Sequence, residues 1–251
     1  MSDGVLSDTK KCEPNKLGFV PESRFGFWFL GTHLWERHVI QISLGDLIKL
    51  MDAPAQSYPV ILDAGCGQGR AFQLLRSSFH PRRIIGLDAE HQALRHAQRR
   101  ALIPDLEVQL LKADCAAIPL DDGSVDLVFC HQTFHHLVRQ DKAMSEFYRV
   151  LKSGGILLFA ESTRAYIDTW LIRLLFRHPM QVQCSADEYL AKIRNAGFVF
   201  GARNVLMPYY WWSRTTLDGF MQLLHLRRVP PSSQRNETLV YMAGVKAGGF
   251  L

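Results

Sequence analysis

A glycine-rich turn early in the chain has the composition of a ligand-binding loop. Residues 60–70 read VILDAGCGQGR, in which Asp63 ends a short apolar run and Gly65, Gly67 and Gly69 follow at alternate positions. Each glycine loses more conformational entropy on folding than another residue would, so three together require a backbone reason. We infer that backbone N–H groups face a ligand here, at the N-terminus of the next helix.

Two later carboxylates stand at the ends of strand-like runs. Asp88 ends RIIGLD, and Asp114 follows EVQLLKA. A carboxylate in the position of Asp88 can accept hydrogen bonds from both hydroxyls of a ribose. The alternatives without a ligand are a helix N-cap for Asp88 and a turn cap for Asp114.

Strand-like and helical patterns alternate through the middle of the chain and must position these residues. The strand-like runs are Val60–Leu62, Arg83–Leu87, Glu107–Lys112, Val125–Cys130 and Ile156–Ala160, and the helical stretches are 68–79, 90–101 and 141–151. This alternation predicts a parallel sheet with helices on both faces. Strands that are apolar at successive positions are typical of such buried sheets.

After residue 162 the alternation gives way to inserts and two further strands. Ser185 and Glu188 have the spacing of a capping box, and Gly197 is a candidate C-cap, so we expect a helix between them. The further strands are Phe198–Leu206 and Glu237–Val245. The fold class expected is therefore α/β: Rossmann-like and doubly wound, with a mostly parallel seven-stranded sheet, helices on both faces and helical inserts.

The chain divides into a tail, a cap segment and a main domain. Apolar residues recur at helical spacing from Leu34 onward, which predicts a helix ahead of the first strand. We expect a flexible tail at residues 1–16, an N-terminal helical cap segment at 17–58 and the main domain at 59–251, with inserts at 163–184 and 208–236.

The bulk composition favours an ordinary globular protein. Of 251 residues, 47% are apolar and 21% charged, and no apolar run is long enough to span a membrane. The N-terminus lacks a signal-peptide pattern, so we expect a cytoplasmic protein, with membrane association left open. Five scattered cysteines argue against disulfides and a cysteine zinc site. The net charge of +5 keeps nucleic acid as an unfavoured alternative partner.

Several motifs between residues 60 and 162 occur together in one order. They are ILDAGCGQG, IIGLDAE, KADCAAIPLDDGSVDLVF, FHHL and RVLKSGGILLFAE. In this order and spacing the chain resembles the class I S-adenosylmethionine-dependent methyltransferases, with a core similar to methyltransferase type 11 and the ubiquinone and menaquinone biosynthesis methyltransferases. The first 58 residues and both inserts are outside the resemblance.

The resemblance implies S-adenosylmethionine as cofactor, with S-adenosylhomocysteine as product. Asp88 would hold the ribose, Asp114 the adenine amino group, and Asp63 would lie near the methionine part. The implied cofactor-binding residues are Asp63, Gly65, Cys66, Gly67, Gly69, Asp88, Ala89, Asp114, Cys115 and His131.

The stretch CHQTFHHL places histidines after the fourth strand-like run. His131 is a candidate general base because imidazole titrates near neutrality, and the equal alternative is that it only hydrogen-bonds to the cofactor or the next loop. A metal on His131, His135 and His136 would need another ligand at suitable spacing, and the sequence offers none, so we expect no metal.

Aromatic residues concentrate in the segments that the family topology puts over the acceptor side. They favour an apolar or aromatic small-molecule acceptor, quinone-like or lipid-like, over the alternatives of an RNA methyltransferase or a non-catalytic S-adenosylmethionine-binding protein. Packing onto the core or contact with a membrane interface are further readings of the same aromatics. The expected acceptor pocket comprises Phe27, Trp28, Trp35, Gln132, His135, Trp170, Tyr209 and Trp212. The oligomeric state stays open.

Overall fold

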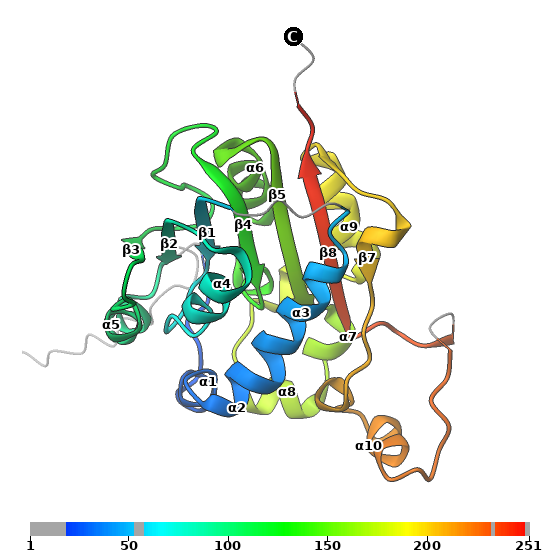
Figure 1. Ribbon diagram of the computed structural model, residues 1–251. Coiled ribbons are helices and arrows are strands. Elements are labelled where there is room, and N and C mark those ends of the chain that lie inside the picture. The colour runs from blue at the N-terminus through cyan, green and yellow to red at the C-terminus, as the bar shows by residue number, and fades with distance from the viewer. Residues whose placement is uncertain (1–18, 53–57, 232–233, 249–251) are drawn as a thin grey trace, which may run out of the picture.

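A computed structural model describes residues 19–52, 58–231 and 234–248. The tail expected at residues 1–16 lies outside this part of the chain. The strands form one sheet in the order β3-β2-β1-β4-β5-β8-β6, with β7 paired to β8 (Figure 1). Within the described residues no helix combines the length and the apolar character needed to cross a bilayer.

Five parallel strands make up the first part of the sheet, as the alternating pattern predicts. They are β1 (Val60–Ala64), β2 (Arg83–Asp88), β3 (Glu107–Lys112), β4 (Val125–His131) and β5 (Leu151–Ser162). Both Ile61 and Leu62, neighbours on β1, are fully buried although they point to opposite faces. Burial on both faces explains why these strands are apolar at successive positions.

The last part of the sheet is antiparallel. Strand β8 (Leu239–Lys246) lies between β5 on one side and β6 (Phe198–Val199) with β7 (Val205–Leu206) on the other. The continuous strand expected at Phe198–Leu206 is wrong, because the helical turn η5 (Ala202–Asn204) interrupts it. The sheet consequently has eight strands rather than seven.

The side chain of Asn204 explains this interruption. Its Oδ1 accepts a hydrogen bond from the backbone N–H of Gly201 at 2.8 Å. Its Nδ2 donates to the carbonyl of Leu50 at 2.9 Å and to Asp52 Oδ1 at 2.8 Å. These bonds hold the turn against the end of a helix far away in the sequence.

Helices cover both faces of the sheet and divide the core into two clusters. Side chains of α6 (Gln140–Val150) and α9 (Ala186–Asn195) belong to one cluster. Side chains of α3 (Gln41–Lys49), α4 (Phe72–Phe79) and α5 (His91–Arg100) belong to the other. Figure 1 shows α3 and α4 in front of the sheet with α6 and α9 behind it.

The predicted capping box is present at the start of α9. Ser185 Oγ accepts from the Glu188 N–H at 3.2 Å, and Glu188 Oε2 accepts from the Ser185 N–H at 2.6 Å. Gly197 follows the last turn with φ +103°, a left-handed conformation suited to glycine.

Short helices form the segments around the carboxyl ends of the strands. The N-terminal segment contains α1 (Arg24–Leu30), α2 (His33–Trp35) and the π-helical turn η2 (Glu36–Ile40), which leads into α3. It begins ten residues before Leu34, where the sequence pattern starts the helix, because Ser23 caps α1 and Thr32 caps α2. The later segments contain α7 (Arg164–Ile167), α8 (Trp170–Leu175), η4 (Met180–Val182), η6 (Trp211–Ser213) and α10 (Leu217–Leu223).

Candidate functional site

A pocket lies at the carboxyl ends of β1, β2 and β4. Strand β1 has β2 on one side and β4 on the other, so the chain reverses its winding direction at this point. Ligands of open α/β sheets bind at such a switch point. The pocket is lined by the glycine turn, by the ends of these strands and by the N-terminal segment.

The glycine turn has the backbone conformation that its sequence predicts. Gly65, Gly67 and Gly69 have φ angles of +77°, +52° and +73°, which favour glycine. A Cβ on Gly65 would collide with Thr133, and one on Gly69 would lie 2.6 Å from the Phe72 ring. A Cβ on Gly67 would meet no protein atom within 4 Å, because this residue borders the pocket. Gly67 therefore leaves bare main chain for a ligand.

Asp88 ties the glycine turn to the second strand. Its Oδ2 accepts from the Gly67 N–H at 2.8 Å, and its Oδ1 accepts from the Glu90 N–H at 2.8 Å. Burial raises the pKa of Asp88, and the hydrogen bonds from Glu90 and Gly67 oppose that rise. The carboxylate also lines the pocket, where its remaining lone pairs are available to a ligand.

Three buried polar atoms at the pocket have no hydrogen-bond partner among the described residues. They are Asp63 Oδ2, His131 Nε2 and Gln132 Nε2. Burial, with a further contribution from Asp88, raises the pKa of Asp63 to about 8. Unpaired buried polar groups cost free energy unless a ligand or water satisfies them.

These atoms fit the methionine part of S-adenosylmethionine. A carboxylate such as Asp63 can accept from its ammonium group, and the Gln132 amide can donate to its carboxylate. Asp88, one strand away, is available to the ribose hydroxyls. The residues at this pocket are therefore compatible with the cofactor that the sequence motifs imply.

Asp114 has the turn-capping contacts that were the alternative to ligand binding. Its Oδ1 accepts from the Ala116 N–H at 2.7 Å, and its Oδ2 accepts from Arg139 Nη2 at 2.8 Å. Asp114 and its neighbour Cys115 nevertheless line the pocket, as do Cys66 and Ala89. Gly69 is the one predicted cofactor residue that does not line it, and it packs against Phe72 instead.

Comparison with known proteins identifies the family. A family profile described as "Methyltransferase domain" matches residues 62–159. A probable S-adenosylmethionine-dependent methyltransferase of Mycolicibacterium smegmatis is 36% identical over 104 residues, which are 41% of this chain and 38% of that protein. Residues 62–159 of this chain therefore form a methyltransferase domain of the class I S-adenosylmethionine-dependent type.

Other relatives of this chain carry more specific names. The demethylmenaquinone methyltransferase of Thermus thermophilus is 32% identical over 127 residues, covering 51% of this chain and 53% of that protein. The malonyl-[acyl-carrier protein] O-methyltransferase of Yersinia pestis is 37% identical over 109 residues, covering 43% and 39%. The chain thus spans between 38% and 53% of the length of the relatives named here.

Solved structures share the fold of this chain. A putative methyltransferase bound to the Trm112 activator of Haloferax volcanii superposes with a TM-score of 0.62 at 19% identity, covering 90% of this chain and 94% of that one. Geranyl diphosphate methyltransferase superposes with a TM-score of 0.59 at 18% identity, covering 82% and 78%. Identities this low support the architecture alone.

His131 lies at the end of β4 in the candidate pocket. Its ring stacks on Phe129, with centroids 5.8 Å apart, and its centroid is 5.9 Å from that of Trp35. Burial, with the nearby His135 as a second cause, lowers the pKa of His131 to about 3. The expectation of a base that titrates near neutrality does not hold for the free protein, because a neutral buried imidazole accepts a proton poorly.

The structure brings only some of the expected acceptor residues to the candidate pocket. Phe27, Trp35 and Gln132 line it. Trp28 and Trp170 instead face outward, with exposed fractions of 63% and 69%. The others lie away from the lining: His135 is buried against Glu161, the Tyr209 ring lies under Arg214 and Arg235, and Trp212 stacks on Tyr210.

Two polar residues of the glycine turn connect it to the N-terminal segment, a role that the sequence did not predict. Gln68 Nε2 donates to the carbonyl of Phe27 at 2.6 Å. Arg70 pairs with Glu36 at 2.7 Å and also donates to the carbonyl of Gly31. The sequence could not predict these partners, which lie about 40 residues earlier, because such contacts depend on the tertiary fold.

Proposed function

We propose that this protein transfers a methyl group from S-adenosylmethionine to an apolar small molecule. The observation that carries the proposal is the juxtaposition of two surfaces in one pocket. The glycine turn, Asp63 and Asp88 suit the cofactor, whereas Phe27, Leu30 and Trp35 add an apolar wall from the N-terminal segment. An apolar lining with a few polar groups is typical of small-molecule sites.

The residues of this pocket act mainly by binding and orientation. When bound, S-adenosylmethionine would supply a methyl group that is already activated on a sulfonium. Asp63 and Asp88 would hold the donor at the strand ends, while Trp35 and Phe129 flank His131 beside it. Holding two reactants in attack geometry supplies a large part of such a rate enhancement.

The class of acceptor is supported by the names of relatives and by the motif content. Relatives are named for demethylmenaquinone and malonyl-[acyl-carrier protein], both of which point away from nucleic acid. Amino-methylating nucleic-acid enzymes typically carry Asn or Asp, two prolines and an aromatic residue after this strand. Here the sequence at the end of β4 reads CHQT instead. RNA is therefore the less favoured acceptor, and of these two names only demethylmenaquinone supports an apolar one.

Contact with a membrane surface is the second part of this proposal. Helices α1 and α8 lie side by side: Ser23 Oγ donates to the carbonyl of Leu175 at 2.5 Å, and the Phe25 and Phe176 rings are 5.8 Å apart. Together they form an edge, called here the α1–α8 edge, of exposed apolar and basic residues: Phe25, Trp28, Trp170 and Leu174 with Arg24, Arg173 and Arg177.

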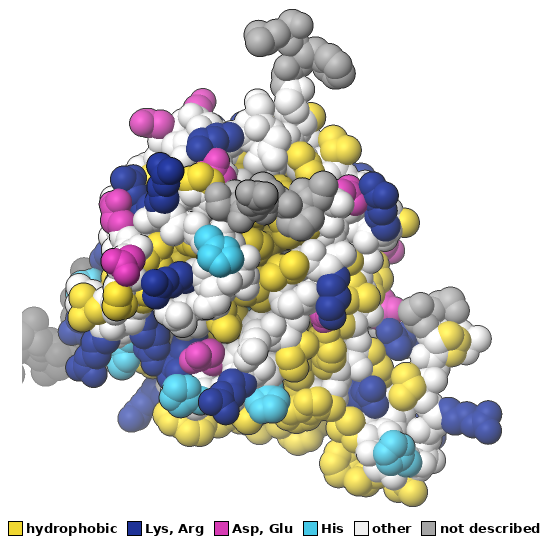
Figure 2. Space-filling model, viewed as in Figure 1, with side chains coloured by type: hydrophobic (Ala, Val, Ile, Leu, Met, Phe, Trp, Pro, Cys, Tyr) yellow, Lys and Arg dark blue, Asp and Glu magenta, His cyan; other side chains and the backbone are white. Residues whose placement is uncertain are grey.

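The chemistry of the α1–α8 edge complements an anionic lipid surface. Figure 2 shows hydrophobic side chains along the lower edge of the molecule, over α1 and α8, with Lys and Arg among them. Exposed tryptophans with arginines suit the interface between headgroups and acyl chains. Helix α1 also contributes Phe27 and Leu30 to the pocket, so a lipid-dissolved acceptor would have a short way in.

Transfer of label tests the catalytic part of the proposal. Full-length protein is incubated with S-adenosylmethionine labelled in the methyl group and with lipid and RNA fractions of a cell extract. We expect label in the organic phase, reduced in an Asp63→Ala variant that is confirmed to be folded. Label confined to RNA would refute the apolar acceptor, and tight cofactor binding without label in any fraction would favour the non-catalytic alternative.

Vesicle sedimentation tests the membrane part. Vesicles with and without anionic lipid are mixed with the wild type, Trp28→Ser and Trp170→Ser. Trp211→Ser is the matched control, because Trp211 is also exposed, at 55%, but lies outside the α1–α8 edge. We expect the first two substitutions to weaken binding to anionic vesicles and the control to retain it. Equal sedimentation of all variants would contradict the assignment.

A further inference from the structure

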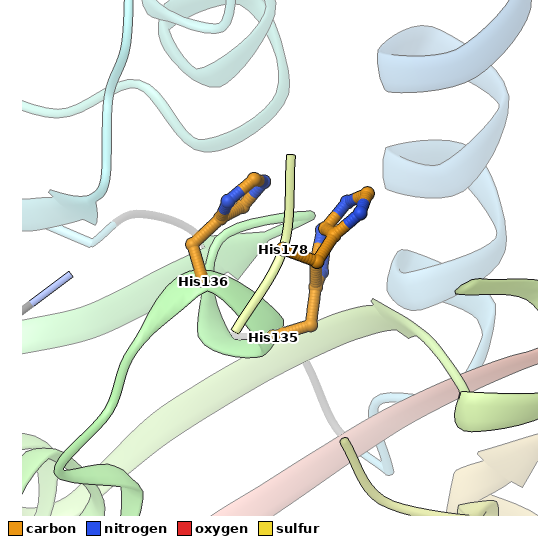
Figure 3. A group of neighbouring side chains, drawn as sticks. All are labelled: His135, His136 and His178. Atoms are coloured by element: carbon orange, nitrogen blue, oxygen red, sulfur yellow. The ribbon is translucent and has the colours of Figure 1, made fainter. Parts of the chain in front are cut away.

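Three imidazoles gather beside the cofactor pocket (Figure 3). His135 and His136 belong to the turn η3 (Phe134–His136), and His178 lies in the segment after α8. Their ring centroids are 4.4 Å apart for His135 and His136, 5.1 Å for His135 and His178, and 4.9 Å for His136 and His178. One potential ligand atom of each lies within 4.8 Å of the other two.

A buried carboxylate fixes the orientation of His135. Nδ1 of His135 lies 2.6 Å from Glu161 Oε2, and the two side chains are only 4% and 0% exposed. The other oxygen, Oε1, accepts from the N–H groups of Thr133 at 2.7 Å and Phe134 at 2.6 Å. An imidazole that donates its Nδ1 hydrogen to a carboxylate presents its Nε2 lone pair, which is the arrangement found behind many metal-binding histidines.

His178 offers an unpaired donor atom to a metal. Nδ1 of His178 is buried and has no hydrogen-bond partner among the described residues. A ligand that binds to this nitrogen would remove the cost of leaving it unpaired.

A second carboxylate stands near the cluster. Glu22 Oε2 lies 3.7 Å from His136 Nε2. Its other oxygen accepts from the N–H groups of Ser23 at 2.6 Å and Arg177 at 3.2 Å, which hold the side chain in place. Both Glu22 and His136 line the pocket, so an ion bound here would lie at its wall.

We propose that His135, His136 and His178 bind a divalent transition-metal ion of the zinc type, with Glu22 next to its fourth position. Three imidazoles and a carboxylate or open position form a common donor set for such ions. Ligand nitrogens of a tetrahedral zinc site lie about 3.3 Å apart, so the present spacing has to close by at most about 1.5 Å. The sequence suggests no such site because His178 is about 40 residues from the pair.

Metal titration of the tag-free, chelator-treated full chain tests this proposal. Co²⁺ is followed by its visible absorption bands and Zn²⁺ by calorimetry. We expect one ion per chain and the absorption of a four- or five-coordinate cobalt site. His178→Gln and His135→Gln should each weaken binding by about 100-fold or more, since each loses a ligand. His91→Gln, at an exposed position of α5, is the matched control and should bind as the wild type does.

The experiment also separates this site from the proposed function. His178 does not line the cofactor pocket, so S-adenosylhomocysteine should bind to His178→Gln with unchanged affinity, which also shows that the variant is folded. If that variant fails to fold, His135→Gln and Glu22→Gln provide the comparison. Absence of stoichiometric binding to the wild type, or equal binding to the histidine variants and the wild type, would overturn the metal site and leave the methyl-transfer proposal standing.

Discussion

The protonation of Asp63 should control how tightly the cofactor binds. Its carboxyl group is buried in the pocket, and Oδ2 has no partner among the described residues. Burial and the nearby Asp88 raise its pKa from 3.8 to about 8, so below that pH the free protein holds a neutral carboxyl group. A ligand ammonium group favours the ionised form, so binding should release a proton.

The size of the effect follows from the shifted pKa. Between pH 6 and 7.5 one proton must leave Asp63 for each ligand bound, so Kd should fall about tenfold per pH unit, or about 30-fold over the whole window. The α-amino group of the ligand remains protonated over this range, because its own pKa is about 8. The affinity should therefore rise with pH until the pH approaches the pKa of Asp63.

Calorimetry with S-adenosylhomocysteine measures both quantities. Titrations in two buffers of different ionisation enthalpy give the number of protons released, which should approach one at pH 6.5. Asp63→Asn is the matched variant: it is nearly isosteric and cannot ionise, so both the slope and the proton release should vanish. A flat Kd in the wild type, or the same slope in the variant, would refute the role assigned to Asp63.

The same shift predicts how the stability of the free protein depends on pH. The folded state retains the Asp63 proton between pH 3.8 and about 8, whereas the unfolded state loses it near 3.8. The contribution of Asp63 therefore lowers the free energy of unfolding as pH rises, by up to about 1.4 kcal/mol per pH unit. The free energy of unfolding of Asp63→Asn minus that of the wild type should accordingly be larger at pH 8 than at pH 5, as measured by urea unfolding.

Two further predictions concern the backbone of the site and of the sheet edge. Gly67→Val should weaken S-adenosylhomocysteine binding at least tenfold, because the side chain fills the pocket wall and strains a left-handed residue by about 1–2 kcal/mol. Gly45→Val, in α3, is the control, since a Cβ added there also meets no atom within 4 Å. Equal binding of both variants would contradict the prediction. Asn204→Ala should lower the free energy of unfolding in urea by about 1–3 kcal/mol, since it removes three part-buried hydrogen bonds, each of which contributes about 0.5–1.5 kcal/mol. A loss below the error of the measurement would show that the turn between β6 and β7 does not depend on this side chain.

The sequence predicts the parallel core and the glycine turn well because both depend on local patterns. Runs such as IIGL are typical of strands buried on both faces, and glycines at alternate positions after a strand indicate a turn in which Gly65 and Gly67 have positive φ. The structure adds a hydrogen bond between Asp88 and Gly67, which meet because parallel strands end at one edge of the sheet.

What could not be predicted depends on contacts between distant segments. The interruption at η5 arises from Asn204 reaching Leu50 and Asp52, and neither partner is marked by the sequence. The low pKa of His131 results from burial that only the packed structure reveals. Phe27 and Trp28 are adjacent in α1, where successive side chains point about 100° apart, so only one of them reaches the pocket.

The bonds from Gln68 and Arg70 to the carbonyls of Phe27 and Gly31 have a kinetic consequence. They fasten the loop that would carry the nucleoside to the segment that walls the other half of the pocket. If S-adenosylhomocysteine left past this N-terminal segment, the bonds from Gln68 and Arg70 would have to break. Loss of the same bonds would also let the segment move away from the acceptor. Breaking these bonds would then be a single opening step that limits the release of both the nucleoside product and the methylated acceptor.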